Sequence, residues 1–474
     1  MLNILSQRIS NLVRYKIISV KNIKVRRQVR YKSTYESWKK NRMANEPLPS
    51  SRADPVIAKL DSPEFLSVFT PELRTLVDLF KKYNYELRIA GGAVRDILMN
   101  KHPTDLDFAT NATPNQMKEI FENENIRMLN VKGEKHGTIT VRINDKDNFE
   151  VTTLRIDNVT DGRHAEVEFT KDWKLDACRR DLTINSMFLD FDGKLYDYFY
   201  GYDDLKNKRI VFVGNVNCRI CEDYLRILRY FRFYGRIMDN PDQHDEATIK
   251  AIKENIDGLQ RISGERIWSE WKKILTEKFA LEMTLKMLEC GSGKYIGLPE
   301  KPDVDNFQIV CRRALSNNVA LKPISMIVSM LKDQQEVMNV HSRLKLSNSD
   351  RDLALFLVQH REYIPCEQPL KPYQQLVFIS QTNKSIDVNR EYIIEILKYQ
   401  GAIELLDEFE KWVIPKFPIK GIMLRNHVPH PKVTSVVLRE LKKIWVNDNF
   451  KSTSDQLMEY VPCIINELNN KMAL

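Results

Sequence analysis

The sequence contains no run of 18 or more apolar residues, although hydrophobic residues make up 43% of its 474 positions. A helix that crosses a bilayer needs about 20 such residues, so a membrane-spanning helix is excluded. Cysteine is scarce, and the odd number of seven, spread over a long chain, disfavours a disulfide framework. The chain also lacks the GxxxxGK pattern, followed by Ser or Thr, of P-loop nucleotide sites. These absences favour a protein of a reducing compartment that does not use a P-loop.

Acidic residues are absent from the first 35 positions, which carry nine Lys or Arg interleaved with Ile, Leu and Val. This composition predicts a mitochondrial transit peptide over residues 1–35, and hence a protein of the mitochondrial matrix. The alternative is a disordered basic arm that touches nucleic acid. A start at Met43 would give a shorter form that stays in the cytoplasm or nucleus, which the sequence allows but does not demonstrate.

Charge is balanced over the rest of the chain. The net charge of +9 equals the nine basic residues of the N-terminal segment, which leaves 64 basic and 64 acidic residues elsewhere. Overall basicity therefore gives no argument for nucleic-acid binding, and only local patches can provide one.

Proline and the periodicity of apolar residues divide the chain. Four prolines in residues 44–63 predict a linker, which we take as residues 36–63. Strand and helix signals alternate up to about residue 200, and after about residue 215 apolar residues recur only at helical spacing. The sequence therefore predicts an α+β fold, with a mixed head over residues 64–200 followed by an all-helical region.

Local signals place the elements of the head. Thr70-Pro71-Glu72 combines an N-cap, a proline at the first helical position and an early acid, which predicts a helix to about Tyr83. Thr113-Pro114 predicts another helix, to about Phe121, in the same way. The other predicted elements are strands at 87–90 and 106–109, a helix at 93–99, and hairpins that pair 138–143 with 149–154 and 187–191 with 194–198.

Two glycines separate a predicted strand from a predicted helix in Gly91-Gly92-Ala93-Val94-Arg95-Asp96. Glycines let the backbone approach a phosphate, and the start of a helix offers unpaired N–H groups and a positive dipole. Arg95 would add a cation in the first helical turn. Taken alone, the pattern fits an ordinary strand-to-helix turn equally well.

Two carboxylates follow ten residues after Arg95, in Asp105-Leu106-Asp107. Residues two apart in a strand point to the same side, so both would face the glycine turn. Such a pair suits Mg²⁺, which binds through a few carboxylates, waters and substrate phosphates. Two metal ions can activate an attacking hydroxyl and neutralise a leaving pyrophosphate. Glu150, at the start of a hairpin strand, is either a third acid of this site or an exposed strand residue.

Arginines are concentrated in two later segments. Arg179-Arg180-Asp181-Leu182-Thr183-Ile184-Asn185 places two guanidinium groups beside an acid, which can bind triphosphate oxygens and a ribose hydroxyl. In the segment 222–236, one helical face carries Arg226, Arg229, Arg232 and Arg236. Four arginines without a lysine favour bidentate recognition of a phosphate or a base over a solvated charged surface.

The order of the motifs GGxVRD, DxD, RRDxTxN and EDxxRxxR resembles the class II tRNA nucleotidyltransferases, or CCA-adding enzymes, and their relatives the bacterial poly(A) polymerases. The resemblance covers about residues 60–275 and includes ISGERIW at 262–268. GEKHGTIT at 133–140 and TDGRHAEVEFT at 160–170 resemble the animal mitochondrial branch of the family. Beyond about residue 280 the likeness is weak.

The resemblance implies a polymerase-β-like head followed by three helical parts: a neck over residues 201–290, a body over 291–400 and a tRNA-binding tail over 401–474. It also implies that residues 157–172 form a flexible loop involved in switching from C to A. Within the head, it implies that Asp105 and Asp107 bind Mg²⁺.

The same resemblance assigns the nucleotide contacts. It implies that Gly92 and Arg95 hold the triphosphate of the incoming CTP or ATP. Its phosphate and sugar are held by Arg180 and Asp181. Its base is read by Asp223 and Arg226, and further contacts come from Arg229 and Arg232.

Hydrogen-bond chemistry supports the assignment of the base-reading pair. Cytosine and adenine both present an amino donor beside a ring-nitrogen acceptor, whereas uracil and guanine present a carbonyl beside an N–H. An aspartate acceptor and an arginine donor three residues apart would therefore accept C and A and reject U and G. Protein side chains can in this way replace a nucleic-acid template.

Two weaker features lie outside these motifs. Residues 411–451 carry nine Lys or Arg against two acids, so Lys442 and Lys443 are candidates to bind the tRNA backbone, with a solvated helical surface as the alternative. Cys218 and Cys221 form a CxxC pattern without a second pair, which disfavours zinc and favours helix packing.

The sequence thus predicts template-independent addition of CCA to tRNA 3′ ends from CTP and ATP, by a monomer or homodimer with no membrane partner. One alternative is a poly(A) polymerase or a partial CC- or A-adding enzyme of the same fold. Another is a catalytically inactive RNA-binding protein, although the intact pair of aspartates argues against it.

Overall fold

The computed structural model describes residues 49–130, 133–160, 165–362, 367–379, 385–425, 427–428 and 431–472. The predicted transit peptide, Met43 and most of the predicted linker lie outside these residues. The chain divides into two units between Arg52 and Ala53, and the second unit, Ala53–Leu474, contains every element described below.

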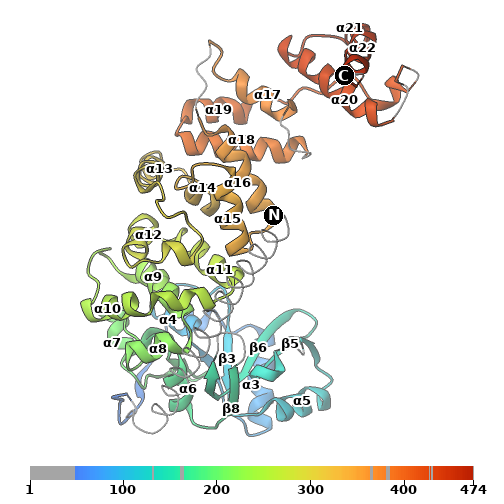
Figure 1. Cartoon of the computed structure of the whole chain (residues 1–474). Helices are drawn as coiled ribbons and strands as arrows, with labels where there is room; N and C mark the ends of the chain where they lie inside the picture. Colours follow the sequence, from blue (N-terminus) through green and yellow to red (C-terminus); the bar gives the residue numbers. More distant parts are fainter. Residues whose placement is uncertain are drawn as a thin grey trace, which may run out of the picture. The chain divides into compact units, whose positions relative to one another are not determined.

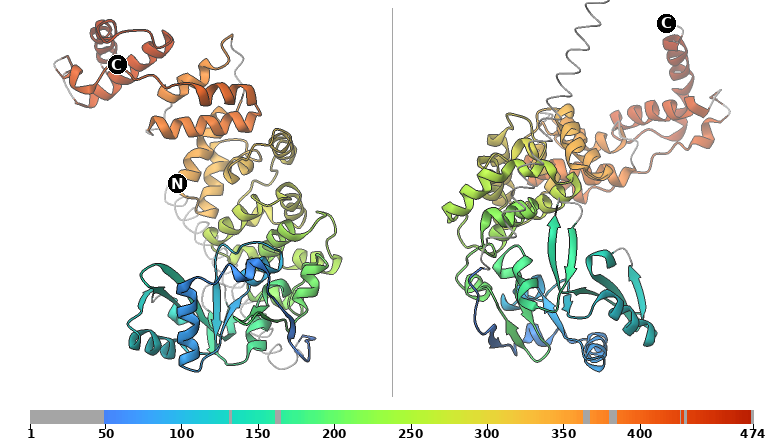
Figure 2. Two further views of the ribbon diagram at one scale, coloured as in Figure 1. Left: turned by 180° about the vertical axis from the view of Figure 1, so that it is seen from behind. Right: turned by 60° about the horizontal axis from the view of Figure 1, so that its bottom comes forward.

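The head is built on an eight-stranded sheet (Figure 1). Its strand order is β1-β10-β9-β2-β3-β6-β5-β4, and all neighbours are antiparallel except β3 and β6, which are parallel. The strands are β1 (Val56–Lys59), β2 (Leu87–Ala90), β3 (Asp107–Thr110), β4 (Arg127–Asn130), β5 (Thr138–Ile143), β6 (Asp147–Thr153), β9 (Phe188–Leu189) and β10 (Lys194–Tyr196). A separate two-stranded ribbon, seen in Figure 2, pairs β7 (Arg155–Thr160) with β8 (Ala165–Phe169).

The helices of the head begin where their capping residues predict. Thr70 accepts a hydrogen bond from the Leu73 N–H at 3.1 Å, and Thr113 and Gln116 form a reciprocal capping box. Both predicted helices are therefore confirmed. The head contains α2 (Pro63–Leu66), α3 (Pro71–Lys82), α4 (Gly92–Leu98), α5 (Pro114–Asn123), α6 (Trp173–Arg179), α7 (Gly201–Lys206) and the short 3₁₀ turns η1 (Glu134–His136) and η2 (Thr183–Asn185).

Both faces of the sheet are buried, because successive strand residues point to opposite sides. Ile89 and Phe108 belong to a hydrophobic cluster that also contains Phe80 of α3. Their neighbours Ala90 and Ala109 belong to a second cluster, which contains Trp173 of α6. The central strands are thus covered on both sides, which holds their ends in fixed positions.

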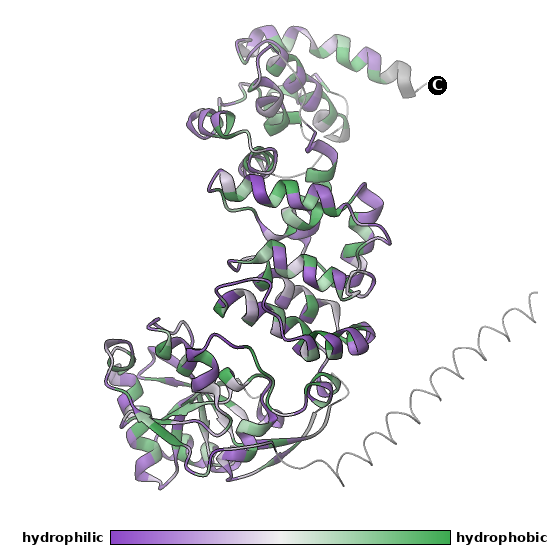
Figure 3. Ribbon diagram, turned by 90° about the vertical axis from the view of Figure 1, so that its left-hand side faces the viewer, coloured by the Kyte–Doolittle hydropathy of each residue, from purple (hydrophilic) through white to green (hydrophobic). Residues whose placement is uncertain are grey.

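Beyond β10 the described residues form helices and no further strand. Polar and apolar residues alternate along these helices (Figure 3), and α9 packs on both α11 and α12. The predicted helical region is confirmed as α8 (Val216–Glu222), α9 (Leu225–Ile237), α10 (Glu246–Asn255), η3 (Ile256–Arg261), α11 (Gly264–Ile274), α12 (Ala280–Glu289), η4 (Gly293–Tyr295), α13 (Val304–Ser316), α14 (Pro323–Val328), α15 (Gln334–Leu344), α16 (Asn348–His360), α17 (Lys371–Ile379), α18 (Ile386–Gln400), α19 (Ile403–Lys411), η5 (Gly421–Leu424), α20 (Pro431–Asn447), α21 (Ser454–Glu459) and α22 (Val461–Met472).

Three sequence predictions need correction. The linker predicted over residues 36–63 contains β1, an edge strand of the head in which Val56 pairs with Tyr196. The loop predicted over residues 157–172 contains most of a β-ribbon, and residues 161–164 lie outside the described residues. The segment 222–236 is not one helix, because Asp223 is extended at φ −150° and separates α8 from α9.

The turn between β2 and α4 depends on Gly91. Its backbone has φ +64° and ψ −117°, a conformation that side chains oppose, and a Cβ there would lie 2.8 Å from Nη1 of Arg180. A Cβ on Gly92 would lie 3.7 Å from Nη2 of Arg95, which is an ordinary contact. Of the two glycines, Gly91 is therefore the one that the backbone requires.

Replacing Gly91 with alanine should lower the free energy of unfolding by about 1–3 kcal/mol, because the backbone is strained and Arg180 must move. Gly92→Ala, at the first position of a helix, should change stability by less than about 1 kcal/mol. Thermal and urea unfolding of both variants would test this. Equal losses in the two variants would contradict the role given to Gly91.

Candidate active site

A polar pocket of about 500 Å³ lies between the head and helices α9 and α11. Its volume is in the range of small-molecule sites, about 300–1,000 Å³. Segments far apart in the sequence contribute the predicted residues to its wall, namely Gly92, Arg95, Asp105, Asp107, Arg180, Asp181, Asp223, Arg226, Arg229 and Arg232. Glu150, Lys442 and Lys443 are not among the residues that line it.

Asp105 and Asp107 provide the exposed carboxylates of the pocket. Asp105 precedes β3 rather than lying in it, and Asp107 is the first residue of that strand. Desolvation raises the pKa of Asp107, the Arg180 guanidinium opposes this rise, and Asp105 adds to it. Two hard oxygen donors beside a polar cavity fit Mg²⁺, which completes its shell with waters and phosphates.

Glu150 lies in register with Asp107 on the parallel strand β6, and both side chains are exposed. However, the described residues contain no group of three or more His, Cys, Asp or Glu side chains arranged to hold a metal ion. The strand register places Glu150 beside Asp107, and its role as a third acid stays a prediction.

Arg95 lies at the base of the pocket and is only 3% exposed. Its Nε and Nη2 donate to Asp96 Oδ1 at 3.0 and 2.8 Å, and its Nη1 donates to Asn185 Oδ1 at 2.6 Å. Burial lowers the pKa of Arg95, and the ion pair with Asp96 opposes this effect. Asp96 also accepts from Nη2 of Arg236 at 3.2 Å, so the same carboxylate joins α4 of the head to α9.

Arg179 and Arg180 are held by Asp176, a buried acid to which the sequence analysis assigned no role. Asp176 accepts from Arg179 Nε at 2.8 Å and from Arg180 Nη2 at 3.1 Å. Burial alone would raise the pKa of Asp176, but the two arginines hold it below its usual range. The spacing of three and four residues along α6 was the available signal.

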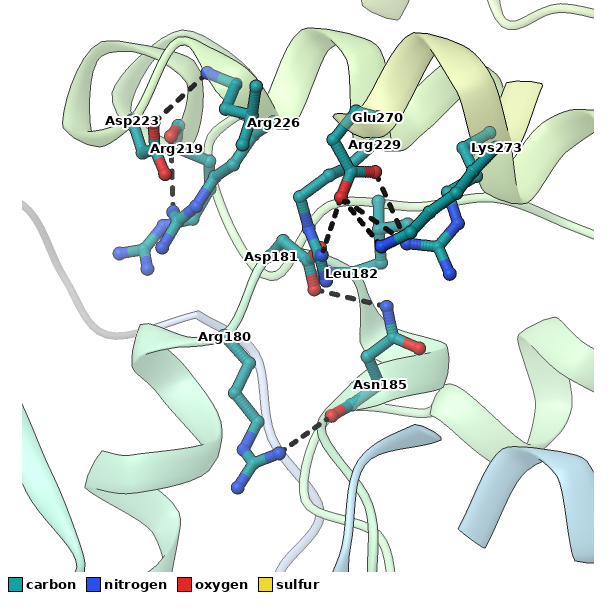
Figure 4. A network of polar contacts seen from close by, with 12 residues as sticks. Arg180, Asp181, Leu182, Asn185, Arg219, Asp223, Arg226, Arg229, Glu270 and Lys273 are labelled. Atoms are coloured by element: carbon teal, nitrogen blue, oxygen red, sulfur yellow. Dashed lines mark hydrogen bonds and ion pairs between the residues drawn. The ribbon is translucent and has the colours of Figure 1, made fainter. Parts of the chain in front are cut away.

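The buried Asp181 and the partly exposed Arg229 form an ion pair, with Oδ2 2.5 Å from Nε (Figure 4). Asp181 also accepts from the Leu182 N–H at 2.8 Å and from Asn185 Nδ2 at 3.2 Å. Burial would raise the pKa of Asp181, but Arg229 holds it well below its usual range. A carboxylate has about four acceptor positions, so one remains for a ligand hydroxyl.

Arg226 is fixed by three acceptors around its guanidinium group. Its Nη1 donates to Glu222 Oε2 at 2.5 Å and to the Arg219 carbonyl at 3.1 Å, and its Nη2 donates to the Arg179 carbonyl at 2.7 Å. Figure 4 shows Arg226 beside Arg219 and Asp223. The orientation of Arg226 is therefore set by the protein before any base arrives.

Asp223 lies in the break between α8 and α9. Its Oδ2 accepts from Nη2 of Arg266 at 2.7 Å, and its Oδ1 accepts from the Leu225 N–H at 3.1 Å. The ion-pair partner is thus on α11. Arg266 is 43 positions away from Asp223 in the chain, so no local spacing signal connects the two residues.

The remaining candidates lie outside this pocket. Lys443 pairs with Glu440 at 2.9 Å, and the Lys442 ammonium lies 5.7 Å from the centre of the Phe417 ring. Cys221 Sγ is 3.2 Å from Asn255 Oδ1, in keeping with the predicted packing role. Within the described ranges, no helix combines the length and apolarity needed to cross a membrane.

Known families match two parts of the chain. Residues 87–211 match the poly A polymerase head domain, and residues 244–300 match a probable RNA and SrmB-binding site of polymerase A. In structure, the chain resembles the Bacillus stearothermophilus CCA-adding enzyme in complex with CTP, with a TM-score of 0.66 over 87% of this chain and 100% of that one. Sequence identity to that protein is 22%, so this likeness concerns the fold.

Closer relatives cover most of the chain. It is 50% identical over 408 residues to the mitochondrial CCA tRNA nucleotidyltransferase 1 of Mus musculus and 49% identical to that of Homo sapiens. Each alignment spans 85% of this chain and 92% of the relative. The chain therefore belongs to the class II CCA-adding enzyme family, with a polymerase-β-like nucleotidyltransferase head followed by helices.

Proposed function

We propose that this protein adds CCA to tRNA 3′ ends without a nucleic-acid template, using CTP and ATP. The observation that carries the proposal is the meeting of two exposed aspartates, Asp105 and Asp107, with the pair Asp223 and Arg226 in one pocket. The first pair suits a phosphate-bound metal, and the second suits the base edge shared by C and A. The names of the mouse and human relatives describe the same activity for those proteins.

The reaction joins the tRNA 3′ oxygen to the α-phosphorus of the nucleotide and breaks the bond from that phosphorus to the bridging oxygen, releasing pyrophosphate. Mg²⁺ held by Asp105 and Asp107 would supply charge neutralisation for the triphosphate. Arg180 and Arg229 line the same pocket and offer donors for phosphate oxygens. Positioning and electrostatics thus account for the chemistry without a covalent enzyme intermediate.

Base selection falls to Asp223 and Arg226. Arg226 is already engaged by Glu222 and two backbone carbonyls, which limits it to one orientation. Asp223 has donors from Arg266 and Leu225 on two of its acceptor positions, which leaves others for an amino group. Fixed donors and acceptors of this kind select a base edge because a mismatched edge leaves them unpaired.

The localisation of the enzyme is part of the proposal. The mouse and human relatives carry mitochondrial names, and the basic segment 1–35 fits import into the matrix. A form that begins at Met43 would serve the cytoplasm and nucleus.

For tRNA, Lys442 and Lys443 on α20 are the proposed contacts to the phosphate backbone. The pairing of Lys443 with Glu440 reduces the net positive charge that Lys443 presents to the tRNA.

With a tRNA that ends before CCA, the protein should restore CCA from CTP and ATP, as read by sequencing the product ends. Asp105→Asn or Asp107→Asn should abolish incorporation of both nucleotides and leave tRNA binding largely intact, because only the metal-binding charge is lost. A tract of A would favour a poly(A) polymerase. Near-normal turnover in either variant would remove the metal assignment.

Asp223→Ala should change which nucleotide is chosen. A lost hydrogen bond to a charged group costs about 1.5–3 kcal/mol, so CTP efficiency should fall roughly tenfold to a hundredfold while discrimination against UTP weakens. The measurement is the CTP-to-UTP efficiency ratio together with a melting curve. If Asp223 only anchors Arg266, the protein will melt earlier and the ratio will stay as in the unmodified enzyme.

Removal of residues 1–35 should abolish import into isolated mitochondria and leave CCA addition in vitro unchanged. The physical reason is the loss of all nine basic residues of a segment without acids. Efficient import of the shortened protein would refute the transit-peptide assignment.

A further inference from the structure

Helix α11 (Gly264–Ile274) places two opposite charges against the pocket. Arg266 and Glu270 are four residues apart, so they share one face of the helix. The other face is anchored in the core, where Ile267 and Trp271 are fully buried and Trp268 is 4% exposed. A helix held this firmly can fix the position of whatever its two charged side chains bind.

Glu270 is a buried carboxylate, 6% exposed, that lies beside Lys273 and two arginines of the pocket wall. Its Oε2 is 3.3 Å from Arg232 Nη1, and its Oε1 is 4.0 Å from Arg229 Nη1 and 3.6 Å from Lys273 Nζ. Figure 4 shows Glu270 directed at Arg229 and Lys273. Without this negative charge, the arginines would repel one another across a partly desolvated space.

Arg266 contacts Asp223, the side chain proposed to read the base. Its Nη2 donates to Asp223 Oδ2 at 2.7 Å, while the Leu225 N–H occupies Oδ1 at 3.1 Å. Two donors from different elements fix the plane of the carboxylate, because rotation about the Cβ–Cγ bond would break both hydrogen bonds. The acceptor positions left open then point in a defined direction.

We infer that α11 is the positioning element of the nucleotide site: Arg266 aims Asp223 at the base, and Glu270 holds Arg229 and Arg232 against the triphosphate. This inference rests on the proposed function, in which Asp223 reads the base. It separates specificity from affinity within one helix, since Arg266 acts on base choice and Glu270 on phosphate binding.

Arg266→Met retains the apolar stem and removes the donors. It should lower the CTP-to-UTP efficiency ratio about tenfold, chiefly through CTP, with little change in tRNA binding. Arg266→Lys, which keeps a charge and a donor, should recover part of the ratio. Combined with Asp223→Ala, Arg266→Met should cause no further loss of the ratio, because both act through one contact.

Glu270→Gln should raise the KM for CTP and ATP alike, by about tenfold, and leave the CTP-to-UTP ratio unchanged. The matched controls are Lys272→Met and Glu265→Gln on the same helix. Lys272 lies 3.9 Å from Asp350, Glu265 is exposed, and neither lines the pocket, so both variants should behave as the unmodified enzyme.

The outcomes separate the inference from the function on which it rests. If the unmodified protein fails to add C and A, or if Asp223→Ala leaves the ratio unchanged, the proposed function fails. If Asp223→Ala changes the ratio but Arg266→Met does not, or if the double variant loses the sum of both effects, the role of Arg266 is overturned. A KM unaltered by Glu270→Gln overturns the role of Glu270.

Discussion

Eight arginines line a single pocket, and their mutual repulsion is the constraint that the surrounding structure must satisfy. The protein meets it by pairing each arginine with a carboxylate: Asp96 with Arg95 and Arg236, Asp176 with Arg179 and Arg180, Asp181 with Arg229, Glu222 with Arg226, Asp223 with Arg266, and Glu270 with Arg232. Each acid lets a guanidinium group stay charged while partly buried, and several donors remain for phosphate oxygens.

These ion pairs also join separate parts of the chain. Arg236 of α9 reaches Asp96 in α4, and Arg229 of α9 reaches Asp181 in the head. The contacts that shape the nucleotide site therefore also hold the first helices of the helical region against the sheet. Loss of one such contact would disturb binding and packing together, so melting curves accompany the kinetic tests of Asp223 and its neighbours.

Local signals were sufficient to predict the α+β head and the helical region, and the resemblance to a known family supplied the ten predicted residues that line the pocket. Two of the acids that pair with the arginines, Asp176 and Glu270, were harder to find. Glu270 and Arg266 act across a helix interface, and no spacing rule connects residue 223 to residue 266. The break at Asp223 was missed because no glycine or proline marks the boundary between α8 and α9. Strand β1 was missed because prolines around it indicated a linker.

Chain order also governs how this site forms. Asp107 is the first residue of β3, and it pairs with Glu150 of the parallel strand β6, 43 positions later. Helix α5 and strands β4 and β5 lie between the two strands in the sequence. A parallel pairing of this span requires closure of a long loop before it gains any contact energy, whereas the β5–β6 hairpin forms locally. The strand pairing that sets Asp107 beside Glu150 therefore costs more loop-closure entropy than the neighbouring hairpin does.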